Sequence, residues 1–188
     1  KMPSLTEQSE KMKELADKLL DSSKLLPILE KYGQVTFVGS YAARLMMHGD
    51  IDIHILREKG FSKKETLDIF NEIVSLTKFN SYYIGDWNDS NAHPEFPYGY
   101  YIGLKKRHAD IHWKIDIWFV STNEQDKFNQ KNLDITKVSL TEKQQEAILA
   151  FKQYRQENGI KISGQRIYEM VINQGARTID DFKRQINL

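Results

Sequence analysis

Two runs of sequence decide the fold of this chain: Val35-Thr36-Phe37-Val38-Gly39-Ser40 and, after nine residues, Asp50-Ile51-Asp52-Ile53. The first run predicts an apolar strand that ends in a Gly-Ser turn, and the residues between the runs predict a helix over 41–47. Glycine permits a tight turn and a close approach of the backbone to a ligand. The amides of Ser40 and Tyr41, at the start of the predicted helix, would then point into a site for an anion such as phosphate.

The second run predicts a strand that carries two carboxylates on one face. Because side chains alternate between the faces of a strand, Asp50 and Asp52 project to one side and the isoleucines between them project into the core. A third acid, Asp116, lies in the middle of residues 111–119, where apolar side chains occupy every second position. A carboxylate in such surroundings is costly unless a positive partner binds it. We therefore expect the three acids to converge on magnesium, which prefers oxygen ligands.

Simpler explanations exist for each of these features taken alone. An Asp-x-Asp pair on a single strand is commonly a solvated face, and Ser40 could serve only as the N-cap of the following helix. The ordered combination of strand, turn, helix and acids favours the site. Two basic residues are further candidates for contact with phosphate: Lys114, on the predicted face of Asp116, and Arg44, one turn into the predicted helix.

In this order of elements the chain resembles the nucleotidyltransferase superfamily, whose best-known member is DNA polymerase beta. The resemblance covers roughly residues 34 to 120 and rests on five residues: Gly39, Ser40, Asp50, Asp52 and Asp116. It implies an α/β (α+β) fold, with a mixed β-sheet nucleotidyltransferase core, flanking helices and a C-terminal helical extension. The length of the chain is similar to that of small bacterial transferases, although the residues place it in no subfamily.

The resemblance also implies an activity. A magnesium-dependent nucleotidyltransferase would move an NMP group from a nucleoside triphosphate, with ATP expected, to a hydroxyl of a small molecule or protein, and would release pyrophosphate. Asp50 and Asp52 would hold two magnesium ions at the triphosphate. Asp116 would ligate the ion that faces the acceptor and help to deprotonate the hydroxyl. Four further residues would contact the nucleotide: Gly39, Ser40, Arg44 and Lys114.

An alternative stays open on the same fold. The chain could be a non-catalytic or partner-dependent binding module of the antitoxin type, which acts by pairing with a helical protein. The presence of all three acids favours the enzyme, because a binding module has no chemical need for three converging carboxylates.

Composition limits the remaining classes of function. The net charge of +1 argues against nucleic acid as a partner, because binding to a phosphate backbone depends on many clustered basic residues. The absence of cysteine excludes disulfides and thiolate zinc sites. No run is apolar for long enough to span a membrane, and the polar start does not resemble a signal peptide, so a cytoplasmic protein is the simplest expectation. Because position 1 is not Met, a leader could have been removed.

The rest of the chain predicts two regions, a core with a leading helix over residues 1–135 and a helical extension over 136–188. Apolar periodicity and turn residues predict helices and strands at these positions: helices over 4–22, 25–32, 62–77, 141–158, 163–173 and 178–186, and strands over 82–85 and 99–104, with a basic turn at 105–108.

The segment 86–97 is dense in turn-forming residues and has no periodicity. Because a loop of this length in a compact domain is often functional, we expect it to border the acceptor pocket. Trp87 or Phe96 could stack on a ring of the acceptor. The simpler alternative is an ordinary surface loop.

Overall fold

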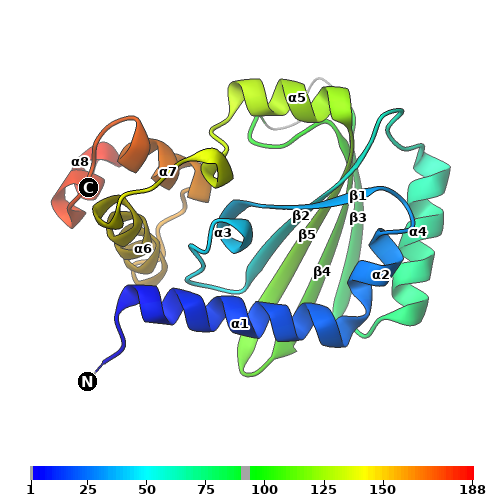
Figure 1. Ribbon diagram of the computed structural model, residues 1–188, viewed down its shortest axis with the longest axis horizontal. Coiled ribbons are helices and arrows are strands. Elements are labelled where there is room, and N and C mark those ends of the chain that lie inside the picture. Colours follow the sequence, from blue (N-terminus) through cyan, green and yellow to red (C-terminus); the bar gives the residue numbers. More distant parts are fainter. Residues whose placement is uncertain (1, 90–93) are drawn as a thin grey trace.

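The computed structural model describes residues 2–89 and 94–188 and contains one five-stranded sheet with the order β1-β2-β5-β4-β3 (Figure 1). Of its neighbouring pairs, only β2 and β5 run parallel. The sheet is therefore mixed, and the predicted fold class is confirmed. The strands have these bounds: β1 Gln34–Val38, β2 Asp50–Arg57, β3 Ser81–Trp87, β4 Gly99–His108 and β5 Ile111–Ser121.

One face of the sheet packs on helices α1 (Leu5–Ser23), α2 (Leu25–Leu29) and α4 (Lys63–Leu76). The isoleucines of β2 and β5 lie on this face and form a continuous core with apolar residues of the three helices. Since burial of apolar surface is the main favourable term in folding, this face fixes the strand register. The alternate side chains, which include the acids of β2 and β5, are thereby directed to the opposite face.

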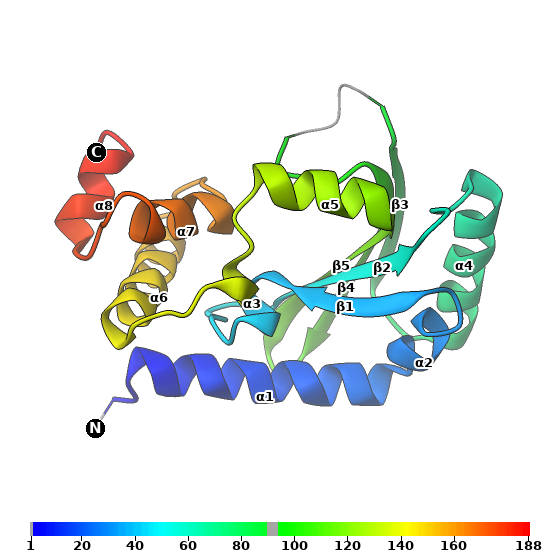
Figure 2. The same cartoon turned by 45° about the horizontal axis from the view of Figure 1, so that its top comes forward.

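Helix α5 (Thr122–Lys131) follows β5 and packs against the ends of β5 and β2. The chain then continues through a 3₁₀ turn, η1 (Ile135–Lys137), into the C-terminal helices α6 (Glu142–Glu157), α7 (Gly164–Ile172) and α8 (Ile179–Gln185). These three helices group where α1 begins, at the end of the molecule away from α4 (Figure 2). They enclose a second core. Its members include Leu45, which the sequence boundary near residue 135 assigned to the other region.

Side-chain caps define the starts of several helices. Capping boxes begin α1 at Ser4, α4 at Ser62, α6 at Thr141 and α8 at Thr178. In each box the side-chain oxygen of the cap residue accepts a hydrogen bond from the backbone amide of the third helical residue. The side chain of that third residue accepts a hydrogen bond from the backbone amide of the cap residue. Such a cap stabilises a helix end by about 1 kcal/mol. The predicted starts of these helices agree with the structure to within a residue or two.

Two local expectations were wrong, and one helix was not predicted. The helix after Gly39, α3 (Gly39–Ala42), ends at Ala42, well short of residue 47, because Arg44 adopts a left-handed conformation with a φ of 57°. The turn expected at 105–108 is part of β4, and the chain reverses at Ala109 and Asp110, both with positive φ, as a two-residue hairpin requires. Helix α5 was not predicted, since it presents few apolar residues.

In the part of the chain that the structure describes, no helix is both long enough and apolar enough to pass through a lipid bilayer.

Candidate functional site

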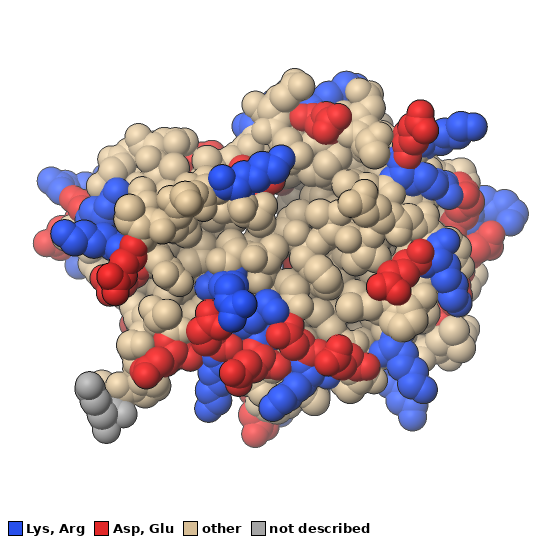
Figure 3. All heavy atoms as spheres, in the orientation of Figure 1, with Lys and Arg blue, Asp and Glu red and all other residues tan. Residues whose placement is uncertain are grey.

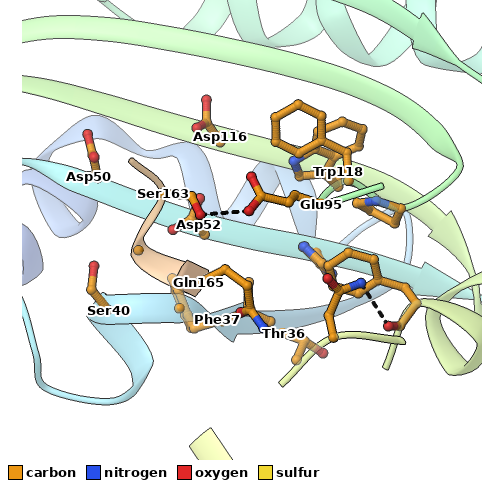
Figure 4. Close-up of a pocket in the computed structure, with 18 of the residues that line it drawn as sticks. Thr36, Phe37, Ser40, Asp50, Asp52, Glu95, Asp116, Trp118, Ser163 and Gln165 are labelled. Carbon is orange, nitrogen blue, oxygen red and sulfur yellow. Dashed lines mark hydrogen bonds between the residues drawn. The ribbon is translucent and has the colours of Figure 1, made fainter. Parts of the chain in front are cut away.

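A cavity of about 1050 Å³ opens on the polar face of the sheet. Side chains from all five strands line it, together with residues of α5 and of the C-terminal helices. Figure 4 shows part of this wall, with Asp50 and Asp52 on one strand and Asp116 and Trp118 on the next. The cavity has the size of a site for a small organic ligand.

The strand register brings the predicted acids to this cavity. In the parallel pair of β2 and β5, Asp52 lies opposite Asp116, and Asp50 lies opposite Lys114. All four side chains line the cavity. The alternation that the sequence predicted therefore places both Asp50 and Asp52 on the polar face, and the pairing of the strands adds Asp116.

Gly39 permits a close contact between the first turn and the acids. Its φ is +63°, and a Cβ atom at this position would lie only 2.8 Å from Oδ2 of Asp52. Ser40, the next residue, is buried and also lines the cavity. Both residues therefore lie where the sequence predicted them, at the edge of the acidic site.

Asp50 and Asp116 each have a basic partner. Oδ2 of Asp50 lies 2.9 Å from Nε2 of His48, and Oδ2 of Asp116 lies 2.8 Å from Nζ of Lys114. The other oxygen of Asp116 accepts a hydrogen bond from the hydroxyl of Tyr101. Desolvation would raise the pKa of Asp50, but the bond from His48 and nearby positive charges hold this pKa below its usual value.

Asp52 lies in a different electrostatic environment from the other two acids. Desolvation and the negative charges of Asp116 and Asp50 raise the pKa of its carboxyl to about 7. The positive charges of Lys114 and Lys152 lower this pKa but do not offset the other effects. Perturbed pKa values of this kind are concentrated at functional sites.

The three carboxylates are chemically suited to bind a divalent cation, but their present positions do not form a metal site. Within residues 2–89 and 94–188, no three His, Cys, Asp or Glu side chains lie close enough together to hold a metal ion. His48 and Lys114 hold two of the carboxylates in the present arrangement. Carboxylates are nevertheless the ligands that magnesium prefers.

The C-terminal helices contribute a second set of charged residues that the sequence reasoning missed. Nζ of Lys152, on α6, donates to the carbonyl of Leu45 and to the hydroxyl of Tyr168, both at 2.9 Å. Burial and the charge of Arg155 lower the pKa of Lys152 to about 7. Arg155 lies beside it, with Nη2 3.3 Å from Nε2 of His48. All of these side chains except Leu45 line the cavity.

Arg44 is not brought to the site. Its guanidinium forms an ion pair with Glu10 of α1, and it is not among the residues that line the cavity. The expected contact with phosphate depended on the longer helix, and the left-handed conformation of Arg44 directs its side chain to the surface instead. On the face drawn in Figure 3, acidic and basic side chains are mixed along α1, the helix that carries Glu10.

The segment 86–97 reaches the cavity at both of its ends, while residues 90–93 lie outside the described residues. Phe96 stacks on Trp118 with ring centroids 5.3 Å apart, and Trp87 packs near both rings. Glu95 accepts a hydrogen bond of 2.6 Å from Ser163, the N-cap of α7, which Figure 4 marks with a dashed line. The segment therefore connects the wall of the cavity to the C-terminal helices.

No protein-family model matches the sequence, and no curated protein matches it significantly. Among solved structures, a cytoplasmic RNA terminal U-transferase superposes with a TM-score of 0.58 at 16% identity, over 87% of this chain and 46% of that one. The non-canonical poly(A) polymerase GLD-2, in its complex with GLD-3, gives 0.52 at 14% identity, over 91% and 58%. Cid1, an RNA terminal uridylyl transferase, gives 0.53 at 15% identity, over 87% and 47%.

The chain thus spans about half of the length of these solved structures. All three are nucleotidyltransferases with the fold of DNA polymerase beta, and at these identities the similarity establishes the fold alone. The resemblance drawn from the five residues of the sequence is confirmed at this level.

Proposed function

From the nucleotidyltransferase fold that the chain shares with these enzymes, we propose that it transfers a nucleotidyl group from a nucleoside triphosphate to a hydroxyl. The observation that carries the proposal is the pairing of Asp52 with Asp116 beside the Gly39-Ser40 turn, in one cavity with basic residues from both halves of the chain. A triphosphate needs positive charge and backbone or hydroxyl donors, and the cavity supplies both.

The phosphate groups would bind between the turn and the basic side chains. Ser40 offers a hydroxyl and an amide, and Gly39 leaves room beside Asp52. Lys114 faces the acids from β5, and Lys152 and Arg155 face them from α6. Binding of a triphosphate would favour the protonated form of Lys152, because nearby negative charge raises the pKa of an amine.

Asp50, Asp52 and Asp116 would hold the magnesium ions, two of them in our proposal, once Oδ2 of Asp116 leaves Lys114, and Asp50 would use the oxygen that does not face His48. The bound ions would neutralise the triphosphate and lower the barrier to displacement at phosphorus. His48 would keep Asp50 oriented through its Nε2 atom, and the hydroxyl of Tyr101 would keep Asp116 oriented through the oxygen that faces away from Lys114.

In the transfer step, the acceptor oxygen attacks the α-phosphorus and forms a new P–O bond. The bond from the α-phosphorus to the bridging oxygen breaks, and pyrophosphate leaves with the electron pair. Asp116 accepts the proton of the acceptor hydroxyl. The residues of the turn and the basic side chains hold the phosphates in place, and such positioning supplies much of the rate enhancement in enzymes of this kind.

We expect ATP as the donor and a small molecule or a protein side chain as the acceptor, in a cytoplasmic protein. The U-transferase and the poly(A) polymerase that share the fold act on RNA, by their names. The net charge of +1 argues against a long nucleic-acid interface here.

The experiment is a transfer assay with α-labelled ATP, GTP, CTP and UTP, with magnesium and a panel of hydroxylated acceptors. We expect label on an acceptor and release of pyrophosphate from the wild type, and loss of both from Asp116→Asn. Asp110→Asn is the matched control, because Asp110 is exposed at the hairpin turn and asparagine tolerates its positive φ. Binding of nucleotide without turnover on any acceptor would instead support the partner-dependent binding module.

A further inference from the structure

Beyond Asp116, the cavity continues onto an open part of the sheet that carries two tyrosines. The rings of Tyr83 on β3 and Tyr101 on β4 lie in contact, with centroids 5.7 Å apart. Tyr83 is 57% exposed, and the hydroxyl of Tyr101 donates to Asp116. We call these two residues, with Lys105 beside them, the tyrosine shelf. It is the part of the cavity wall that faces Asp116 from the side away from the Gly39-Ser40 turn, across β4 and β3.

Two glycines make room for these rings. A Cβ atom on Gly103 would lie 2.3 Å from the hydroxyl oxygen of Tyr101, and one on Gly85 would lie 3.1 Å from the ring of Tyr83. Gly103 is the register partner of both Asp116 and Tyr83, so it occupies the position between the acid and the exposed ring. Because these two strand positions are glycines, no side chain covers the face there, and the rings extend along the sheet toward Asp116.

The shelf also carries unbalanced positive charge. Lys105 and Lys114 are direct cross-strand partners on the face that lines the cavity. Like charges directly opposite each other are destabilising, and an anion between them would relieve the repulsion. Lys114 has Asp116 as its partner, whereas no carboxylate among the described residues forms an ion pair with Lys105. The surface thus offers an exposed aromatic ring and a free ammonium group within one site.

We propose that the tyrosine shelf binds the acceptor, and that the acceptor is an unpaired nucleotide. Its base stacks on Tyr83 and Tyr101, its phosphate lies at Lys105, and its ribose hydroxyl reaches Asp116. This inference rests on the proposed function, since it names the acceptor of the same transfer. One nucleotide suffices to occupy the shelf, which agrees with the small net charge. A free mononucleotide and the 3′ end of a single-stranded RNA present this same chemistry.

The test uses equilibrium binding with the donor site saturated by magnesium and the non-hydrolysable α,β-methylene analogue of ATP. The probes are adenosine monophosphate, a short single-stranded oligoadenylate, and kanamycin, which has hydroxyls but no aromatic ring. We expect Tyr83→Ala to weaken binding of the adenylate probes by about tenfold, as loss of one stacked base does, and Tyr83→Phe to retain it. Tyr98→Ala is the matched control, because Tyr98 is exposed but lies outside the cavity lining.

The charge is tested separately. Lys105→Gln should weaken binding of adenosine monophosphate more than that of adenosine, while Lys106→Gln, on the opposite face of β4, should change neither. Preference for the oligoadenylate would identify an RNA end as the source of the nucleotide, and equal binding would identify the free nucleotide.

Three results would contradict nucleotide binding at the tyrosine shelf. They are wild-type binding of kanamycin but of no adenylate probe, absence of binding of all three probes, or equal binding of the adenylate probes by Tyr83→Ala and Tyr98→Ala. Failure of the donor analogue to bind would count against the proposed function instead. In that case the same titrations without the analogue still decide whether Tyr83 binds a base.

Discussion

Asp52 on β2 and Asp116 on β5 are direct partners in the only parallel strand pair among the described strands. Desolvation and the negative charges of Asp116 and Asp50 raise the pKa of Asp52 to about 7. The fold therefore holds like charges together where stability alone would separate them. The magnesium site that we propose would account for this arrangement, because bound positive charge would offset the repulsion.

Replacement of Gly39 tests the contact between the turn and the acids. Gly39→Ala should destabilise the protein by more than the about 1 kcal/mol that a left-handed alanine costs, because its Cβ would also meet Asp52. Gly159→Ala is the matched control, since Gly159 has a φ of +61° and nothing within 4 Å of the added atom. Urea unfolding compares the two, and nucleotide binding should fall in Gly39→Ala only. Equal effects of the two changes would show that Asp52 does not depend on the turn.

Lys114 and Arg44, which the sequence suggested as contacts for phosphate, should differ in their effect on nucleotide affinity. Lys114→Gln should weaken binding of the magnesium–nucleotide complex by about tenfold, of the order expected for loss of a charge-assisted contact. Arg44→Gln should leave it unchanged, because Arg44 pairs with Glu10 on the surface. Calorimetric titration of both variants measures the difference. A loss of affinity in Arg44→Gln would show that this side chain moves to the site when nucleotide binds.

The buried amine of Lys152 predicts a dependence of stability on pH. Its pKa is lowered to about 7 in the folded protein, whereas an unfolded lysine titrates near 10.4. Between these values the unfolded state binds more protons, so the free energy of unfolding should rise with pH, by up to about 1.4 kcal/mol per unit.

Lys152→Met is the comparison for this effect. Denaturant unfolding of the nucleotide-free protein from pH 7 to pH 10 should show the rise in the wild type and a smaller slope in the variant. Parallel slopes would mean that Lys152 keeps its proton in the folded state.

The sequence was sufficient to predict which face of the sheet carries the acids, because they alternate with isoleucines that must face the core. Asp50 and Asp52 follow from this pattern alone, and Asp116 follows from the same pattern on β5. Local sequence could not predict the end of the helix at Ala42, because the left-handed Arg44 is held from outside the segment, by Glu10 and by Ser9, whose hydroxyl donates to the Arg44 carbonyl.

The contribution of the C-terminal helices to the site could not be predicted from motifs. Lys152 reaches the carbonyl of Leu45 across 107 positions of sequence, a tertiary contact that no short pattern records. One signal was available: Lys152 lies among the buried positions of α6, next to Phe151, and a lysine at a core position requires a partner. Helix α5 was not predicted because it has few apolar residues, so that only its cap at Ser121 distinguishes it from a polar loop.

The most direct test is calorimetric binding of ATP, GTP, CTP and UTP, with and without magnesium, to the wild type and to Asp52→Asn. Asparagine retains the shape of the side chain and removes its charge, so the variant should fold, which circular dichroism checks. We expect the wild type to bind at least one triphosphate only when magnesium is present, and Asp52→Asn to lose this binding. Equal affinity in the two proteins, or binding that does not depend on magnesium, would contradict the proposed magnesium site.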